Sequence, residues 1–185
     1  MNPGGVRVRR LATADLTPAD VAAVRTLMEA AFGDDPDERF TEDDWQHAVG
    51  GTHVLLDVDG ELVSHASVVG RRIEVDGRPL RTGYVEAVAT TPGRQGLGHG
   101  TVVMDEVGRL IREQFELGVL GTGSHHFYER LGWTTWTGPS FVRSADGLLP
   151  TPADDGYLMV LRTPSSPVID TAAPISCEWR PGDVW

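Results

Sequence analysis

The chain has 185 residues, of which 40% are hydrophobic and 23% are charged, and its formal net charge at pH 7 is −11. This composition is ordinary for a globular protein, and the length predicts a single domain over residues 1–185. The excess of negative charge argues against a nucleic-acid partner and favours cationic ligands, which it attracts over long distances.

Two further features bear on where the protein works. The first ten residues lack the apolar core of a signal peptide, and no run of about 18 apolar residues occurs in the sequence. Cys177 is the only cysteine, which excludes an internal disulfide and a cysteine metal cluster, and we expect it to be a small buried residue. We therefore expect a cytoplasmic protein that does not span a membrane.

The first expected elements are two helices. Residues 17–20, Thr-Pro-Ala-Asp, are typical of a helix start with Thr17 as the cap and proline at the first helical position, and this helix runs to about Phe32. Thr41 can cap a second, short helix through His47, which the glycines at positions 50 and 51 end.

Three strands are expected next, at residues 53–58, 62–73 and 81–89. The dipeptides Asp59-Gly60 and Asp76-Gly77 between them are typical of tight hairpin turns. The pattern predicts an antiparallel meander.

The remaining elements alternate between helix and strand. The expected helices cover residues 101–114 and 125–131, and the expected strands cover residues 117–120, 134–142 and 157–161. Residues 163–174, which are rich in proline and serine, are expected to be irregular. Helices first, strands next and a β-α-β-α-β end predict a mixed α/β fold.

The most informative segment is Gln-Gly-Leu-Gly-His-Gly at residues 95–100, between the strand at 81–89 and the helix at 101–114. Glycines leave successive backbone N–H groups unobstructed, and the positive end of the following helix adds attraction for phosphate. A dinucleotide loop would have the spacing Gly-x-Gly-x-x-Gly near the first strand, and a Walker loop would have a lysine before Thr101. The segment therefore predicts a pyrophosphate site of another kind, with a plain turn as the alternative.

Gln95, Gly98 and Gly100 occupy the fixed positions of the pattern Gln/Arg-x-x-Gly-x-Gly. In this the segment resembles the coenzyme A loop of the GCN5-related N-acetyltransferases (GNAT). The resemblance implies an acetyl-CoA-dependent enzyme and the GNAT fold, a central and mostly antiparallel sheet flanked by helices.

Acetyl transfer to an amine needs a base that makes the amine neutral and an acid for the departing thiolate. Glu86 interrupts an apolar strand just before the glycine-rich segment, which suggests a chemical role, although the exposed face of an alternating strand is the other interpretation. Tyr128 has a phenol that can protonate the coenzyme sulfur, although a tyrosine in isolation is more often a packing residue.

The chain also resembles the aminoglycoside 2'-N-acetyltransferases over nearly its whole length. The tail, Cys-Glu-Trp-Arg-Pro-Gly-Asp-Val-Trp at residues 177–185, is the most specific part of this resemblance. The other matching blocks are residues 31–32, 40–45, 49–53, 71–72, 83–86, 128–133 and 136–139.

This second resemblance implies a role for each matching residue. Glu86 would be the base, acting through water, and Tyr128 the acid. The residues implied for the pantetheine arm are Val88, Ala89 and Thr90. Those implied for the pyrophosphate are Gln95, Gly96, Leu97, Gly98, His99 and Gly100. Those implied for the aminoglycoside, a polycation, are Asp44, Glu86, Ala87, Asp154, Asp183 and the terminal carboxylate of Trp185. The family also implies a homodimer and antibiotic resistance.

The sequence departs from the family at two places. Residues 33–39 are longer than in family members and end in arginine, which leaves open which of Asp34, Asp35 and Asp37 replaces the usual aspartate. Residues 121–124 are rich in glycine where the family has a serine-rich turn, so the family's serine contact to the substrate is not assigned to Gly121 or Thr122, and the role of residues 121–126 stays open.

Several histidines invite other interpretations. His125 and His126 are adjacent and would point apart on a helix, with no third ligand at a useful spacing, so we expect no metal site. His65 follows Ser64, but neighbours on a strand point to opposite faces, and we interpret His65 as a packing residue. Two alternatives to the aminoglycoside enzyme remain: an acetyltransferase of another cationic amine, such as a polyamine or a peptide, and a non-catalytic module that binds coenzyme A or aminoglycoside.

Overall fold

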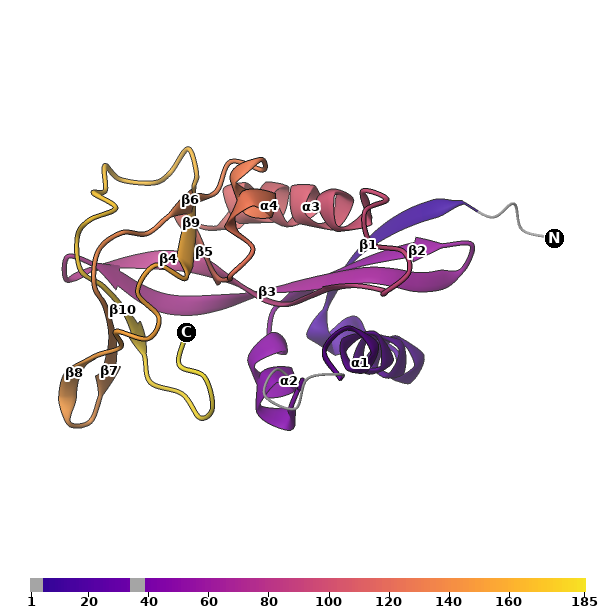
Figure 1. Cartoon of the computed structure of the whole chain (residues 1–185), viewed down its shortest axis with the longest axis horizontal. Helices are drawn as coiled ribbons and strands as arrows, with labels where there is room; N and C mark the ends of the chain where they lie inside the picture. The colour runs from indigo at the N-terminus through magenta and orange to yellow at the C-terminus, as the bar shows by residue number, and fades with distance from the viewer. Residues whose placement is uncertain (1–4, 34–38) are drawn as a thin grey trace. The chain divides into compact units, whose positions relative to one another are not determined.

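The computed structural model describes residues 5–33 and 39–185 (Figure 1). Asp34, Asp35 and Asp37, one of which was expected to replace a family ligand, lie outside the described residues. The elements of the first half are β1 (Val6–Ala12), η1 (Thr13–Asp15), α1 (Pro18–Phe32), α2 (Glu42–Ala48), β2 (Thr52–Val58), β3 (Glu61–Val75) and β4 (Arg78–Thr90). Those of the second half are α3 (His99–Gln114), β5 (Leu117–Gly121), α4 (His125–Glu129), β6 (Thr134–Thr135), β7 (Ser140–Ser144), β8 (Gly147–Pro150), β9 (Leu158–Arg162) and β10 (Ile175–Glu178).

Both predicted helix starts are confirmed, and each is a capping box. At α1 the Thr17 hydroxyl accepts from the Asp20 N–H at 3.1 Å, and the Asp20 carboxylate accepts from the Thr17 N–H at 3.0 Å. Thr41 and Asp44 repeat this exchange at α2, at 3.3 and 2.7 Å. Each box satisfies backbone N–H groups that the first helical turn leaves unpaired.

The predicted meander is also confirmed. Asp59 and Gly60 have φ values of 55° and 85°, and Asp76 and Gly77 have φ values of 49° and 74°. Two successive left-handed residues are the requirement of a type I′ hairpin turn, which explains the choice of Asp-Gly at both places.

The chain divides into two compact units, each described here by itself. The first comprises the described residues of Met1–Val69 together with Val85–Val107. In it, β2 pairs antiparallel with both β1 and β3. In Figure 1, α1 and α2 lie on one side of these strands, and α3 lies on the other. A buried cluster joins the helices to the sheet: Val24, Leu27, Met28, Trp45, Leu55 and Ala89.

The second unit comprises Gly70–Tyr84 and Gly108–Trp185. The strands of the sheet follow one another in the order β6-β9-β5-β4-β3-β10-β7-β8. The pairs β4–β5 and β7–β10 are parallel, and the other described pairs are antiparallel. The fold is thus mixed α/β with a mostly antiparallel sheet, as expected.

The expectation of one strand over residues 134–142 is wrong, because the structure has two short strands, β6 and β7, there. Between them the N–H groups of Thr137 and Gly138 both donate to the Thr171 carbonyl at 2.9 Å, and Pro139 has no N–H for a ladder. A Cβ on Gly138 would lie 2.1 Å from the Ala173 carbonyl oxygen, so the backbones touch at this point. Strands β1, β8 and β10 were not expected.

Candidate active site

The glycine-rich segment leaves the end of β4 and enters α3. Gly96 and Gly98 have φ values of 77° and 86°, a conformation that residues with a side chain rarely adopt. Apart from the glycine itself and its two chain neighbours, no described residue has an atom within 4 Å of the place where a Cβ would stand on Gly96 or Gly98, so these two positions are open. An open loop with exposed backbone before a 16-residue helix fits a pyrophosphate.

The loop is tied to the strand that precedes it. The Gln95 side-chain amide donates to the Thr90 carbonyl at 3.2 Å, so this amide fixes the loop. Ser64 on β3 donates to the Ala89 carbonyl at 2.9 Å, and its oxygen lies 2.8 Å from the Thr90 hydroxyl. Val88 is half-buried. The residues expected along the pantetheine arm therefore belong to a strand end that side chains of β3 hold in place.

Glu86 lies on β4 next to an irregularity in the backbone. Ala87 has a φ of 50°, which places a residue with a Cβ in the left-handed region. Because the strand leaves the extended conformation here, the alternation that would have made Glu86 an exposed strand residue is interrupted. Glu86 is half-buried, and Ser67 donates to its backbone carbonyl at 3.4 Å.

Tyr128 lies on the short helix α4 and is only 7% exposed. Its ring contacts Phe127 and Trp133 edge to face, with centroid distances of 4.9 and 6.2 Å. Burial raises the pKa of the Tyr128 phenol to about 12, because the charged form loses its solvation. The phenol is therefore protonated at neutral pH, as an acid must be.

In the second unit the structure brings Asp154 and Asp183 together with Asp155. The pKa of the Asp154 carboxyl is raised, first by burial and then by the negative charges of Asp183 and Asp155. Asp155 accepts from the Ser140 N–H and hydroxyl, both at 2.8 Å. This group, called here the acidic cluster, favours a bound cation, since a positive charge would relieve the mutual repulsion of its carboxylates.

The tail reaches the same group of residues. Trp185 is 9% exposed, and its indole N–H donates to the Thr151 hydroxyl at 2.9 Å. Arg180 donates to the Trp185 carbonyl oxygen at 3.3 Å and to the Asp183 carbonyl oxygen at 2.7 Å. Trp185 is therefore held by both its ring and its backbone.

Upstream of the chain end, β10 is fixed by charged groups. The Arg71 guanidinium, with a side chain 4% exposed, lies 3.5 Å from the Glu178 carboxylate and donates to the Glu178 carbonyl at 3.0 Å. It also stacks over the Tyr84 ring at 4.7 Å, and Arg180 lies over the same ring at 5.5 Å. Cys177, on the same strand, is buried as expected, and burial raises the pKa of its thiol to about 11.

Asp44, in the first unit, has a structural role at the start of α2. Its carboxylate closes the capping box of α2, and one oxygen, Oδ2, makes both contacts to Thr41. The residue type alone did not distinguish this helix-capping role from a ligand role, although a Thr-x-x-Asp spacing is the signal of the former.

Two hydrogen-bonded histidines that contact β4 were not predicted from the sequence. His53 and His65 are fully buried, and their rings are joined by a hydrogen bond of 2.9 Å between His53 Nδ1 and His65 Nε2. His65 is buried, as its interpretation as a packing residue requires, but it is also a hydrogen-bonded residue. Spacing could not reveal the pair, because its members lie on different strands and meet only through the β2–β3 pairing.

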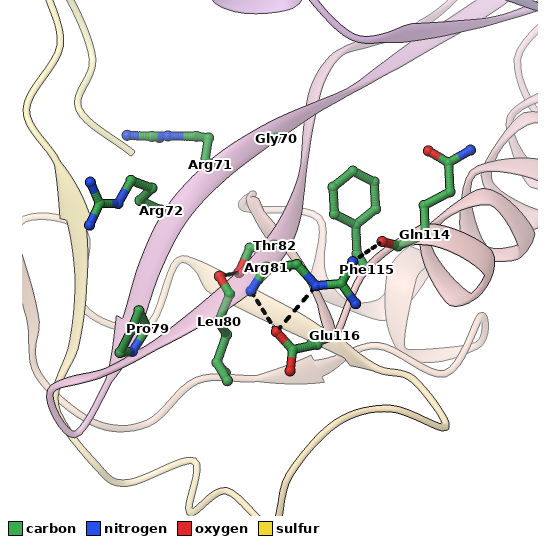
Figure 2. A pocket seen from close by; sticks show the side chains of 10 residues that line it. All are labelled: Gly70, Arg71, Arg72, Pro79, Leu80, Arg81, Thr82, Gln114, Phe115 and Glu116. Atoms are coloured by element: carbon green, nitrogen blue, oxygen red, sulfur yellow. Dashed lines mark hydrogen bonds and ion pairs between the residues drawn. The ribbon is translucent and has the colours of Figure 1, made fainter.

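One pocket of about 490 Å³ lies in the second unit (Figure 2). Its wall includes Leu80, Phe115 and Glu116, and the Glu116 carboxylate accepts from the Arg81 N–H at 2.9 Å. None of the predicted site residues lines this pocket. Within residues 5–33 and 39–185, no group of three His, Cys, Asp or Glu side chains is placed to hold a metal ion. In the same part of the chain, no helix combines the length and apolar character needed to cross a membrane.

Comparison with known proteins is consistent with this arrangement. Residues 13–136 match the family described as acetyltransferase (GNAT) domain. A protein of Mycolicibacterium fortuitum named aminoglycoside 2'-N-acetyltransferase is 39% identical over 188 residues, covering 98% of this chain and 94% of its own.

Two solved structures share the fold at lower identity. A GNAT family acetyltransferase from Brucella melitensis, in complex with acetyl-CoA, has a TM-score of 0.61 and 21% identity over 90% of this chain and 94% of its own. Escherichia coli ElaA has a TM-score of 0.58 and 19% identity over 84% of this chain and 99% of its own. At these identities the likeness supports the fold alone.

Proposed function

This chain belongs to the aminoglycoside 2'-N-acetyltransferase family of the GCN5-related N-acetyltransferases, and from that membership we propose that it acetylates the 2'-amino group of an aminoglycoside. The acyl donor of GNAT enzymes is acetyl-CoA. The homologue of Mycolicibacterium fortuitum, whose name states this activity, supports the proposal over nearly the full length of both chains.

The observation that carries the substrate class is the acidic cluster. Asp154, Asp155 and Asp183 lie close enough for their charges to raise the pKa of the Asp154 carboxyl. An aminoglycoside bears several ammonium and hydroxyl groups, which carboxylates bind through charge-assisted hydrogen bonds. We assign Asp154, Asp183 and the Trp185 carboxylate to the substrate, together with Asp44, whose Oδ1 takes no part in the capping box. Glu86 and Ala87 complete the assignment.

The open loop at residues 95–100 is assigned to the pyrophosphate of acetyl-CoA, and Val88, Ala89 and Thr90 are assigned to its pantetheine arm. Bound there, acetyl-CoA supplies an acetyl group activated as a thioester. The glycine backbone provides N–H donors, Gly96 and Gly98 add no side chain at the two places where the loop has positive φ values, and Gln95 holds the loop to Thr90.

Two residues are assigned to the proton transfers. Glu86 removes a proton from the substrate ammonium through a water molecule, which frees the nitrogen lone pair for attack on the thioester carbonyl. Tyr128 donates to the sulfur as negative charge develops on it, and its raised pKa keeps it protonated until that moment. Work in the cytoplasm, a homodimeric state and a part in antibiotic resistance belong to the same proposal.

Mass analysis of tobramycin, which has a 2'-amine, after incubation with the protein and acetyl-CoA tests the activity. One added acetyl group is expected, and kanamycin A, which has a hydroxyl at that position, should gain none. Spermidine and a peptide amine, run beside them, test the alternative acetyltransferases. Acetylation of spermidine but not of tobramycin would overturn the proposed substrate, and binding without acetylation of any amine would point to a non-catalytic module.

A further inference from the structure

We propose that His53 and His65 are positioning residues, which hold the Ala87 carbonyl through a directed chain of hydrogen bonds and thereby aim Glu86 and the end of β4. The chain runs from Thr13 Oγ1 to His53 Nε2 at 2.9 Å, from His53 Nδ1 to His65 Nε2 at 2.9 Å, and from His65 Nδ1 to the Ala87 oxygen at 2.8 Å. The inference rests on the proposed role of Glu86 as base.

The direction of every bond in the chain follows from its last acceptor. A carbonyl oxygen only accepts, so His65 Nδ1 carries its proton and, in a neutral ring, His65 Nε2 is an acceptor. His53 Nδ1 must then be the donor to His65, which leaves His53 Nε2 as an acceptor. The Thr13 hydroxyl has two acceptors in reach, His53 Nε2 at 2.9 Å and the Gly51 carbonyl at 3.2 Å, and in this assignment its proton goes to the nearer one, His53. Both rings are thereby fixed in the Nδ1–H tautomer.

The surroundings keep both rings neutral. His53 and His65 are 0% exposed, and burial lowers the pKa of His53 to about 4 and that of His65 to about 3. Thr13 completes the chain at its other end, because its oxygen accepts from the Gly50 N–H at 2.9 Å. All four ring nitrogens have a partner without any charge, which is the condition for a buried polar network to hold one geometry.

Ala87, the last residue of the hydrogen-bond chain, has a backbone conformation that needs support from its surroundings. Ala87 has a φ of 50°, which is unfavourable for a residue with a Cβ and persists only where the surroundings impose it. It separates Glu86 from Val88, the first residue assigned to the pantetheine arm. A change at Ala87 therefore moves the proposed base and the acyl donor relative to each other.

Strand β3 supports the same irregularity with side chains. Ser67 donates to the Glu86 carbonyl at 3.4 Å, His65 to the Ala87 carbonyl and Ser64 to the Ala89 carbonyl at 2.9 Å. These side-chain donors bind the carbonyls around a residue that is not extended. Of the three, only His65 is itself fixed by a further buried ring, so it transmits position from β2 to β4.

Two substitutions at His65 test its hydrogen bonds to Ala87 and to His53 separately. The amide nitrogen of asparagine in His65→Asn falls near the position of Nδ1 and can still donate to Ala87. The amide of glutamine in His65→Gln falls near Nε2, keeps the contact to His53 and loses Ala87. We expect His65→Gln to lower kcat on the order of tenfold, the effect of losing roughly one hydrogen bond, with His65→Asn closer to the wild type.

Two more variants control for stability and test the cause. Val54→Ala removes buried volume from β2, where Val54 is 0% exposed, and should lower stability with kcat unchanged. Ala87→Gly, added to His65→Gln, should restore turnover in part, because glycine adopts the left-handed conformation without help. Equal kcat in His65→Gln, His65→Asn and wild type would overturn the proposal.

A readout independent of activity keeps this test separate from that of the proposed base. In ¹⁵N NMR of the imidazoles of the wild-type protein at pH 7, both rings should show the Nδ1–H tautomer. An Nε2–H tautomer or a charged ring at His65 would reject the chain whatever the kinetics show. If Glu86→Gln keeps full turnover while the tautomers are as expected, the role of Glu86 fails and the hydrogen-bond chain stands.

Discussion

At the scale of residues, the two groups assigned to proton transfer are prepared by different means. Glu86 is half-buried beside Ala87, whose backbone is left-handed. Tyr128 packs against two aromatic rings, and burial raises its pKa to about 12. A thiol of ordinary acidity has a pKa near 8.5, so full proton transfer from such a phenol would cost about 5 kcal/mol. Tyr128 therefore acts first as a hydrogen-bond donor to the developing thiolate, and completion of the transfer needs the phenolate to be stabilised.

Substitution of Glu86 tests the role of base directly. Glu86→Gln should lower kcat by about 10²- to 10⁴-fold, the usual contribution of a general base, and leave acetyl-CoA affinity largely intact. The loss should shrink at high pH, where more of the substrate amine is already neutral. Rates would be measured from pH 6 to 10, with calorimetry of CoA binding as the control. Turnover near wild type across that range would make Glu86 a strand residue or a substrate contact.

The buried histidines predict how stability depends on pH. Their pKa values of about 4 and about 3 lie below the 6.5 of an unfolded histidine, so the unfolded chain binds more protons as the pH falls. The stability gained from burying the neutral rings is complete above about pH 6.5 and is lost as the pH falls toward 4 and then 3.

Urea unfolding at a series of pH values measures this dependence. Between about pH 6 and pH 4, the unfolding free energy should fall by up to about 2.7 kcal/mol per pH unit from the two histidines. In His65→Leu, that slope should be smaller by about 1.4 kcal/mol per pH unit, because one titrating ring is gone. An unchanged slope in this variant would show that His65 is not held neutral in the folded protein.

At the scale of elements, the features predicted correctly from the sequence are those that depend on neighbouring residues. Helix caps at Thr17 and Thr41 and the Asp-Gly hairpins depend on neighbours within four residues, and all of them are confirmed. Strands β1 and β10 depend on partners far along the chain, whereas β8, which was also not expected, pairs with the neighbouring strand β7. The exposed strand β1, for example, shows no clear alternation and is recognised only by its pairing with β2.

The same distinction holds for the candidate site. The glycine-rich loop is a contiguous segment, and its positive φ values follow from its residue types. The hydrogen-bond chain joins residues from four separate parts of the sequence: Thr13, His53, His65 and Ala87. No spacing pattern in the sequence could therefore predict it. The helix-capping role of Asp44 is also local, because it depends on the Thr-x-x-Asp spacing with Thr41.

The loop at the start of α3 gives a prediction at this scale. Gly98→Asp places a side chain on a residue with a φ of 86° and adds negative charge where phosphates are expected, so CoA affinity should fall at least about tenfold. Gly147→Asp is a matched control, because Gly147 also has a positive φ, 108°, and open space at its Cβ. Calorimetry with CoA compares the two folded variants. Equal affinities would remove the loop from the coenzyme site.

At the scale of the whole molecule, β3, β4 and α3 each run through both compact units. Neither unit contains the whole of any of these three elements, which favours one domain over residues 1–185. The single domain itself stays a prediction. The negative charge, −11 overall, has a local counterpart in the acidic cluster of the second unit. A polycationic substrate would experience both the long-range attraction and the local ligands.

The chain end offers the sharpest test of that electrostatic argument. A C-terminal extension keeps the Trp185 ring and its hydrogen bond to Thr151 but turns the terminal carboxylate into a neutral amide. The KM for tobramycin should rise about tenfold while the KM for acetyl-CoA stays the same, because an ion pair with a partly buried carboxylate is lost. The rise should shrink with added salt, which screens the attraction in the unextended protein.

Deleting Val184 and Trp185 should have a larger effect on aminoglycoside binding than the extension, since it also removes the indole that anchors the tail. An extension of the same length at the N-terminus is the control, and it should leave both KM values unchanged. The competing partner of the chain end is Arg180, which donates to the Trp185 main-chain oxygen at 3.3 Å. If the C-terminally extended protein is folded and keeps its KM for tobramycin, Arg180 has neutralised the chain end, and the cation is bound by Asp154 and Asp183 without it.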